Sequence, residues 1–331
     1  MSVKIIAELA QGYEGNPSQT IELTKAALKT NCDIIKFQCL YADETAVPDY
    51  KHYKFFKKLE MDFVVWSQVN KMIKKQKKEL MLNVSGFKSF KIAKDLNLKS
   101  VKLHTTHFFF NDLINEIKDE FQNLYFSVGG IHLNEIKKFI KKHSFNKKKF
   151  KNRINFTYGF QSSPTPIEKN NILKLQSYIK AFPGFNFGFE DHTSKNSELK
   201  FTTPMLALPL GIKHLEKHLT LKNKVIEDSE SALTPNEFHK FVLHVRTFEK
   251  ALGDGNLKLS NEELKYRKRM LKVVVANRDI KKLQKINKND ISLKRVNLSN
   301  INCIHQTELV LGKKIKKEKK KHDIILKKDF I

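Results

Sequence analysis

Eight short segments rich in apolar and β-branched residues alternate with lysine-rich amphipathic segments from the start of the chain to about residue 255. In segments such as 20–30 and 133–143, apolar residues recur every three or four positions, which is typical of helices packed on a sheet. Strands joined by helical crossovers pair in parallel, so this order predicts an α/β fold, the (β/α)8 or TIM barrel. The predicted strands are 3–8 (VKIIAE), 33–38 (DIIKFQ), 80–84 (LMLNV), 100–104 (SVKLH), 124–128 (LYFSV), 154–158 (INFTY), 185–189 (FNFGF) and 212–216 (IKHLE).

The pattern changes at 253–270, where glycines are followed by a charged run. Beyond it, 271–280 and 291–298 have the composition of strands. A barrel of roughly 250 residues accounts for the first part of the chain. We therefore predict a barrel domain over 1–258, a linker over 259–270 and a small, mostly β domain over 271–331.

The chain is strongly basic, with 62 Lys and Arg against 35 Asp and Glu and a formal net charge of +27. Such a charge attracts nucleic acid, anionic lipid or an anionic substrate. The excess, however, is lysine spread along the chain together with many Ile, Asn and Phe, as an AT-rich coding bias would produce. The basic run 313–323 is interrupted by Ile315 and followed by an apolar segment, so we expect a solvated face and no nucleic-acid partner.

We expect a cytoplasmic protein with no membrane partner. Cys32, Cys39 and Cys303 are odd in number and have no CxxC spacing, which argues against a disulfide framework. The first apolar segment is broken by Glu8 and does not have the pattern of a signal peptide. No stretch approaches the roughly 18 to 20 apolar residues of a membrane span.

Polar residues gather where the predicted strands end, and active sites of such barrels are built at that end. Lys36 and Lys102 lie inside apolar strands, and a buried ammonium group is costly unless an anion meets it. The two lysines suit a phosphate or carboxylate ligand; alternatively, they form salt bridges to Glu8 or Glu216 within the barrel. The polar set is Glu8, Lys36, Gln38, Asn83, Lys102, His104, Thr105, Thr106, His107, Ser127, Tyr158, Gln161, Glu190, Asp191, His192, Thr193, Glu216 and His218.

Two histidines, His192 and His218, fall at neighbouring strand ends, where both can reach one divalent metal ion. The alternative for a lone histidine is a hydrogen-bonded structural role. His214 shares a strand face with Glu216 and His218 but lies deeper in the barrel, so we expect it to be structural. We expect Glu216 to orient a ligand or to meet a lysine.

Seven segments at the predicted strand ends resemble, in this order, the sialic acid synthase family. They are 6–16 (IAELAQGYEGN), 33–38 (DIIKFQ), 100–106 (SVKLHTT), 125–130 (YFSVGG), 162–166 (SSPTP), 188–193 (GFEDHT) and 215–220 (LEKHLT). The C-terminal domain resembles the antifreeze-like SAF domain, a β-clip fold, through 273–282 (VVVANRDIKK), 291–296 (ISLKRV) and 311–315 (LGKKI). Each motif is weak alone, but the ordered set with the second domain is specific and covers nearly the whole chain.

That family condenses phosphoenolpyruvate with an N-acetylated amino sugar such as N-acetylmannosamine, forming a nonulosonic acid and phosphate. The resemblance implies the same carbon–carbon bond-forming transferase reaction here. It implies catalytic roles for Lys36 and Lys102, which would contact phosphoenolpyruvate, and for Glu8, a carboxylate near the acceptor sugar. The residues that it implies for substrate binding are Gln38, Asn83, Thr105, Ser127, Gln161, Asp228 and Arg295.

The resemblance also implies a metal and a partner. His192 and His218 would bind a divalent metal, usually manganese with magnesium as an alternative, and Asp228 would lie beside it. Arg295 corresponds to an arginine that reaches the acceptor's acyl group from the other subunit, which implies a domain-swapped homodimer. The expected partners are therefore phosphoenolpyruvate, an amino-sugar acceptor and a second copy of the chain.

Three positions depart from the family pattern. His107 stands where the family usually has Glu, so an acceptor-side carboxylate is missing or is supplied elsewhere. Glu190 stands where the family commonly has Ser, and a carboxylate there would repel a phosphate unless it turned away or bound the metal. Residues 295–297 read RVN in place of RPG, which changes the setting of Arg295. These departures leave the acceptor open.

Two other functions stay open. One is a related metal-dependent barrel aldolase or synthase with a different donor, although the SAF-like domain argues against it. The other is a catalytically inactive, basic barrel protein that binds polyanions. Loss of catalysis would be expected to erode the lysines and histidines of the site together, yet all four are present: Lys36, Lys102, His192 and His218.

Overall fold

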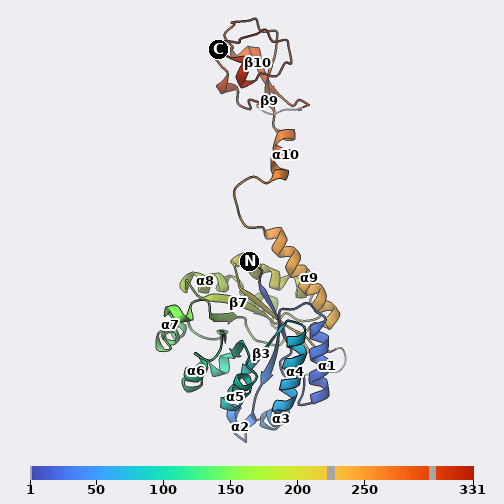
Figure 1. The fold of residues 1–331 in the computed structure, drawn as a ribbon, viewed down its shortest axis with the longest axis vertical. Helices are drawn as coiled ribbons and strands as arrows, with labels where there is room; N and C mark the ends of the chain where they lie inside the picture. Colours follow the sequence, from blue (N-terminus) through green and yellow to red (C-terminus); the bar gives the residue numbers. More distant parts are fainter. Residues whose placement is uncertain (1, 222–227, 298–302) are drawn as a thin grey trace. The chain divides into compact units, whose positions relative to one another are not determined.

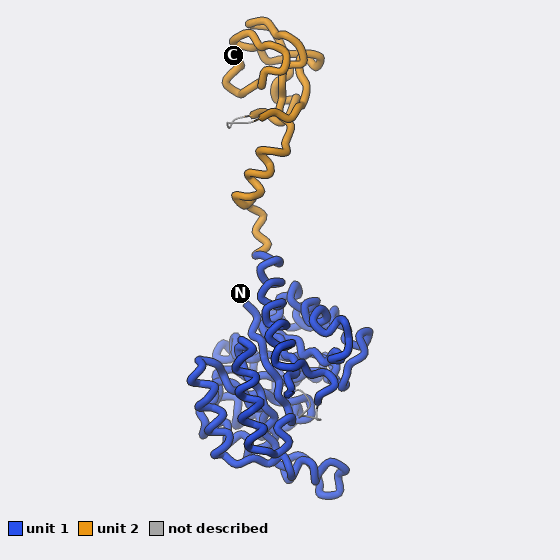
Figure 2. The backbone as a smooth tube through the Cα atoms, turned by 90° about the vertical axis from the view of Figure 1, so that its right-hand side faces the viewer, with its two compact units in different colours: residues 1–253 blue, residues 254–331 orange. Residues whose placement is uncertain are grey.

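The computed structural model describes residues 2–221, 228–297 and 303–331. The chain forms two compact units, Met1–Gly253 and Asp254–Ile331, which Figure 2 shows in blue and orange. Within the described ranges, no helix is long and apolar enough to cross a bilayer.

The first unit is a closed barrel of parallel strands that neighbour one another in chain order, with the last strand pairing with the first (Figure 1). This confirms the predicted (β/α)8 barrel. Each strand overlaps one of the segments predicted from the sequence. The strands are β1 (Lys4–Glu8), β2 (Ile34–Cys39), β3 (Glu79–Val84), β4 (Ser100–Leu103), β5 (Asn123–Ser127), β6 (Ile154–Tyr158), β7 (Asn186–Asp191) and β8 (His214–His218).

Helices surround the barrel. They are α1 (Pro17–Leu28), α2 (Ala42–Thr45), α3 (Tyr53–Leu59), α4 (Phe63–Lys75), α5 (Phe87–Asp95), α6 (Asn111–Ile117), α7 (Leu133–Lys142), α8 (Leu173–Ala181) and α9 (Pro235–Leu252). The first is capped by the side chain of Asn16, which accepts a hydrogen bond from the Gln19 amide at 3.2 Å. Between β7 and β8 the chain forms 3-10 segments instead of an α-helix, and Pro209, inside the second segment, lacks the backbone donor that a longer helix would need there.

Alternation along the strands decides which side chains fill the barrel. A small apolar cluster inside it is separate from the main core, which the intervening strand residues form with the helices. Glu8 and Lys36 lie two residues beyond members of this cluster on the same strand faces. A polar layer therefore lies above an apolar layer at the carboxyl ends of the strands. The members of the inner cluster are Ile6, Ile34, Met81 and Tyr125.

The deep histidine of β8, His214, is buried in the barrel. Its Nε2 lies 2.9 Å from the Thr157 hydroxyl, and its ring meets the Tyr125 ring edge-on with centroids 4.9 Å apart. Gly188 of β7 pairs with it in register, and a Cβ at this glycine would lie only 2.1 Å from the imidazole Cδ2. The imidazole ring therefore occupies space that any side chain at position 188 would need.

A buried pair of opposite charges, Lys217 and Asp191, joins β8 to β7 on the strand faces opposite to those of Glu190 and Glu216. Lys217 Nζ donates to Asp191 Oδ2 at 2.5 Å and to the Thr193 carbonyl at 3.0 Å. Neither charged side chain is accessible to solvent. Adjacent residues of β7, Glu190 and Asp191, thus send carboxylates to opposite faces of the sheet.

The second unit contains an antiparallel pair of strands, β9 (Val273–Ala276) and β10 (Ile291–Lys294), and this small sheet confirms the β fold predicted for this part of the chain. The predicted linker 259–270 contains a helix, α10 (Asn261–Met270), whose residues 261–269 are all exposed. Position 298 of the predicted strand 291–298 lies outside the described residues. The unit has its own core, formed by Val274, Ala276, Ile280, Ile286, Ile291, Ile304, Val310, Ile315 and Ile325.

We predict that Gly188→Ala destabilises the barrel. The added Cβ would overlap the His214 ring, and overpacking of this kind costs about 1–3 kcal/mol of the free energy of unfolding. Urea unfolding should therefore show a lower midpoint than for the parent protein. In a His214→Ala background the ring is gone, so the same substitution should cost much less. An equal loss in both backgrounds would contradict the prediction.

Candidate active site

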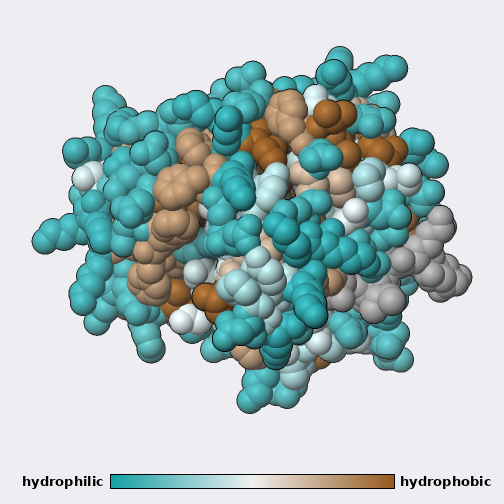
Figure 3. Space-filling view, turned by 90° about the horizontal axis from the view of Figure 1, so that it is seen from below, coloured by the Kyte–Doolittle hydropathy of each residue, from teal (hydrophilic) through white to brown (hydrophobic). Residues whose placement is uncertain are grey.

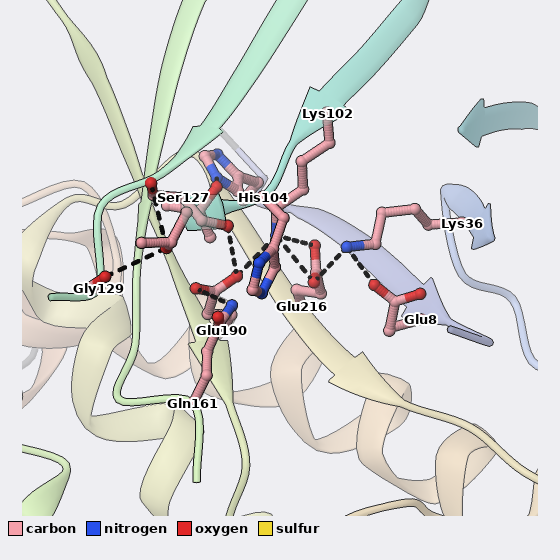
Figure 4. A network of polar contacts seen from close by, with 12 residues as sticks. Glu8, Lys36, Lys102, His104, Ser127, Gly129, Gln161, Glu190 and Glu216 are labelled. Atoms are coloured by element: carbon pink, nitrogen blue, oxygen red, sulfur yellow. Dashed lines mark hydrogen bonds and ion pairs between the residues drawn. The ribbon is translucent and has the colours of Figure 1, made fainter. Parts of the chain in front are cut away.

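Charged side chains form a continuous network inside the barrel at the carboxyl ends of the strands (Figure 4). Glu216 of β8 lies at its centre and bridges two lysines. Its Oε1 accepts hydrogen bonds from Lys36 Nζ at 2.7 Å and from Lys102 Nζ at 2.9 Å. Lys36 also pairs with Glu8, and Lys102 Nζ donates to Glu190 Oε2 at 2.6 Å. All five side chains are buried, so the network is shielded from water.

The register of the strands places these groups at two successive inward-facing positions, since on β8 Glu216 pairs with Ile6 of β1 and His218 pairs with Glu8. Glu8 of β1 is level with Lys36 of β2 and, on its other side, with His218 of β8. Glu190 of β7 is level with Glu216 of β8. Because inward-facing positions recur every second residue, the charges converge on the barrel axis rather than on the helices.

Burial and the lysines set the protonation of the carboxyl groups. Burial is the largest influence on Glu8 and raises its pKa to about 7, against the opposing charge of Lys36. Burial also disfavours a charged Glu216, but Lys102 and Lys36 outweigh it and hold the pKa of Glu216 well below its ordinary value. For Lys102, the carboxylates of Glu190 and Glu216 likewise outweigh burial and raise the pKa. Glu216 and Lys102 are therefore charged at neutral pH, whereas Glu8 lies near its midpoint.

Besides its contact with Lys102, Glu190 accepts hydrogen bonds from two uncharged side chains. The Ser127 hydroxyl donates to its Oε2 at 3.3 Å, and the Gln161 amide nitrogen donates to its Oε1 at 2.7 Å. The Thr105 hydroxyl, in contrast, donates to the carbonyl of Gly129 at 3.1 Å. The residue that departs from the family pattern therefore does not turn away from the site; it points into it.

Two other predicted substrate-binding residues lie nearby. Asn83 is buried, and its side-chain oxygen has no hydrogen-bond partner within the described part of the chain. Gln38 accepts a hydrogen bond from the side chain of Gln11 at 2.9 Å. The side-chain oxygen of Asn83 is thus a buried acceptor without a partner among the described residues.

The two predicted metal ligands meet beside the network. The Nε2 atoms of His192 and His218 are 3.2 Å apart, and burial lowers the pKa of both rings, which are neutral at neutral pH. Two nitrogens that each lie about 2.1 Å from one ion are about 3 Å apart at a right angle, so the pair fits a shared divalent metal. Among the residues that the structure describes, no group of three or more His, Cys, Asp or Glu side chains is arranged as a metal site. The two rings alone would leave further coordination positions to water or substrate.

A cavity of about 170 Å³ opens above this network. Seven of the residues predicted from the sequence line it, namely Glu8, Lys36, Gln38, Gln161, His192, His218 and Asp228. Three further residues line it without a predicted substrate contact, namely His104, Ser163 and Glu216. His104 and Glu216 could be found because they follow or end strands, whereas Ser163 had no signal beyond its place in the segment 162–166.

Other predicted residues do not line the cavity. Lys102 and Ser127 are bonded to Glu190, and Asn83 and Thr105 are likewise absent from the cavity wall. Arg295 lies in the second unit, where it is exposed and borders a separate hollow. The structure thus brings together the residues predicted on the barrel, but only part of that set is open to a ligand.

The face of the molecule seen in Figure 3 mixes polar areas, drawn in teal, with apolar areas, drawn in brown. Loops and helix starts that follow four of the strands, at the carboxyl end of the barrel, contribute exposed apolar side chains. They are Val47, Tyr50, Phe87, Phe109 and Phe160.

The raised pKa of Glu8 predicts a pH dependence of stability. Its pKa is about 7 in the folded protein and near 4.5 when exposed, so the folded state binds the proton more tightly. The contribution is fully present below about pH 4.5 and is lost as the pH rises through 7. Relative to Glu8→Gln, the parent protein should therefore lose free energy of unfolding between pH 5 and 8, measured by urea titration. Glu116→Gln, which neutralises an exposed carboxylate of α6, should follow the parent; a Glu8→Gln curve parallel to the parent's would contradict the prediction.

Comparison with known proteins matches both units. Residues 23–257 match the model of the NeuB family, and residues 272–331 match the SAF domain. An N,N'-diacetyllegionaminic acid synthase of Campylobacter jejuni is 26% identical over 336 residues, covering 97% of this chain and 98% of the relative. A pseudaminic acid synthase of the same species is 26% identical over 345 residues, covering 99% of this chain and 96% of the relative.

Among solved structures, the N-acetylneuraminic acid (sialic acid) synthetase of Leptospira borgpetersenii matches with a TM-score of 0.72 at 21% identity. The match covers 82% of this chain and 93% of that chain, and it concerns the fold. The family and domain matches follow the order that the sequence motifs indicate, which confirms the resemblance. The chain therefore belongs to the NeuB family and carries a C-terminal SAF domain.

Proposed function

We propose that this chain is a nonulosonic acid synthase that condenses phosphoenolpyruvate with an N-acetylated amino sugar and releases phosphate. The observation that carries the proposal is the presence of two buried lysines, Lys36 and Lys102, beside a pair of neutral histidines in a NeuB-family barrel. A small, highly anionic donor requires fixed positive charge in a site with little water, and buried ammonium groups supply it. The relatives named as legionaminic and pseudaminic acid synthases support the reaction class.

In the proposed reaction, the vinyl carbon of phosphoenolpyruvate attacks the aldehyde carbon of the open-chain sugar, water adds to the resulting cation, and phosphate leaves. Lys36 and Lys102 would hold the anionic groups of the donor and offset their charge. Glu8, with its pKa raised to about 7 by burial, can accept or release a proton near neutral pH. We assign it to a hydroxyl of the acceptor sugar.

We propose that His192 and His218 hold a divalent metal, manganese or alternatively magnesium, with Asp228 beside them. When bound, such an ion supplies Lewis-acid polarisation of the aldehyde oxygen. Burial keeps both imidazoles unprotonated, which leaves their ring nitrogens free to coordinate. Asp228 lines the same cavity as the two rings.

We further propose a domain-swapped homodimer in which the partner subunit's Arg295 reaches the acceptor. Two observations support this assembly. Arg295 is exposed in the second unit, and exposed apolar side chains such as Phe109 and Phe160 follow β4 and β6 at the carboxyl end of the barrel. Exposed apolar patches rimmed by polar residues commonly mark protein interfaces.

The central test is an acceptor screen. Purified protein with manganese and phosphoenolpyruvate should release phosphate only when a suitable amino sugar is added, and the product mass should equal the sum of donor, sugar and water less phosphoric acid. The panel comprises N-acetylated hexosamines and bacillosamine-type diacetamido sugars. Lys102→Met should abolish release, because the donor loses a charged contact. Absence of phosphate release across the whole panel would contradict the proposed function.

The metal assignment predicts that His218→Ala lowers the manganese content of the purified protein and reduces kcat/KM by more than about a hundredfold, since one of two ligands is lost. His214→Ala removes an imidazole from the same strand face, two positions deeper than Glu216, and should retain manganese. Metal content can be measured by elemental analysis and manganese affinity by calorimetry. Unchanged affinity in His218→Ala would overturn the ligand assignment.

A further inference from the structure

Glu190 already receives the hydrogen bonds that a bound anion would need. Its carboxylate accepts from the Lys102 ammonium group at 2.6 Å, from the Gln161 amide at 2.7 Å and from the Ser127 hydroxyl at 3.3 Å. The side chain is 1% exposed, and Figure 4 shows these donors converging on its two oxygens. Lys102, Ser127 and Gln161 thus form a small anion-binding seat, and the carboxylate of Glu190 occupies it.

Glu190 is one of two carboxylates that meet Lys102. Glu216 alone meets this lysine with both carboxylate oxygens, at 2.9 and 3.0 Å. With Glu8 included, three carboxyl groups share two ammonium groups, Lys36 and Lys102. Glu190 therefore adds negative charge to a site that must attract an anion.

Glu190 is also fitted into its place. A Cβ at Gly159 would lie 2.5 Å from Glu190 Cγ, so the backbone of the loop after β6 approaches the side chain closely. The open cavity of about 170 Å³ reaches Lys36 and Gln161 but not Lys102 or Ser127. An anion that enters from the mouth can form hydrogen bonds with Lys102 and Ser127 only if the carboxylate of Glu190 moves away from them.

We propose that Glu190 is a specificity-determining residue, an internal anion that holds the seat formed by Lys102, Ser127 and Gln161 and competes with external phosphate or carboxylate groups. Identification of the displaced group as part of phosphoenolpyruvate rests on the proposed function. The competition weakens the binding of phosphoenolpyruvate, because this substrate must displace the carboxylate of Glu190 and then lie beside it. Like charges a few ångströms apart in a shielded site repel strongly.

The test is calorimetric titration of the full chain with inorganic phosphate, without added metal, and separately with phosphoenolpyruvate. Glu190→Ser empties the seat, and Glu190→Gln removes the charge while keeping the size, with one oxygen left to accept hydrogen bonds. We expect phosphate to bind about tenfold or more tightly to Glu190→Ser, with a smaller gain for Glu190→Gln. The matched control is Glu230→Gln, which neutralises an exposed carboxylate that accepts from Ser163 at the cavity and should leave phosphate affinity within about twofold.

Thermal melts of each variant establish folding, and Glu190→Gln serves if the serine variant does not fold. Phosphate affinity that stays unchanged in both Glu190 variants would overturn the proposal. The outcome for the proposed function is separate. A gain in phosphate affinity without product formation in any variant would support the role of Glu190 and contradict the synthase reaction. Product formation without a gain in phosphate affinity would support the synthase reaction and contradict the role of Glu190.

Discussion

Two ammonium groups inside a closed barrel are tolerated only because carboxylates meet them there. Removing an ion from water costs several kcal/mol even after the protein relaxes, and the partner must be held in good geometry to offset that cost. Glu216 meets both Lys36 and Lys102, which lie 180 and 114 residues away along the chain. Because these partners come from separate strands, the network forms only when the barrel closes. The polar interior and the closure of the fold therefore depend on each other.

Burial in the barrel has opposite outcomes for the protonation of neighbouring side chains: some stay charged and others become neutral. Lys102 and Glu216 remain charged because each meets opposite charge. His192 and His218 lose their protons because burial is not compensated there to the same extent. The mouth of the barrel thus combines fixed charges, which suit anionic groups, with neutral nitrogen ligands, which suit a metal.

Much of this could be predicted from the sequence, because the relevant signals are local. Short apolar and β-branched runs define the strands, and lysines within such runs, Lys36 and Lys102, mark a polar interior. The pairing of Lys102 with Glu190 could not be predicted, since it joins β4 to β7 across the barrel and depends on side-chain reach rather than on spacing. Periodicity alone does not show that 3-10 segments replace the helix before β8, although Pro209 is a local signal against a continuous helix there. In the predicted linker, the Ser260 cap was a sufficient local signal for α10.

β7 carries two adjacent carboxylates, and each finds a lysine on its own face of the sheet. If β7 slipped by one residue against β8, a carboxylate would still face inward, so charge complementarity alone does not define the alignment. The glycine two residues earlier does, because a slip in either direction would bring Phe187 or Phe189 against the His214 ring. The contact between Gly188 and the His214 ring, in the uncharged layer beneath the site, therefore allows only one alignment of β7 with β8. A residue with no side chain therefore determines which acid, Glu190 or Asp191, faces the interior of the barrel.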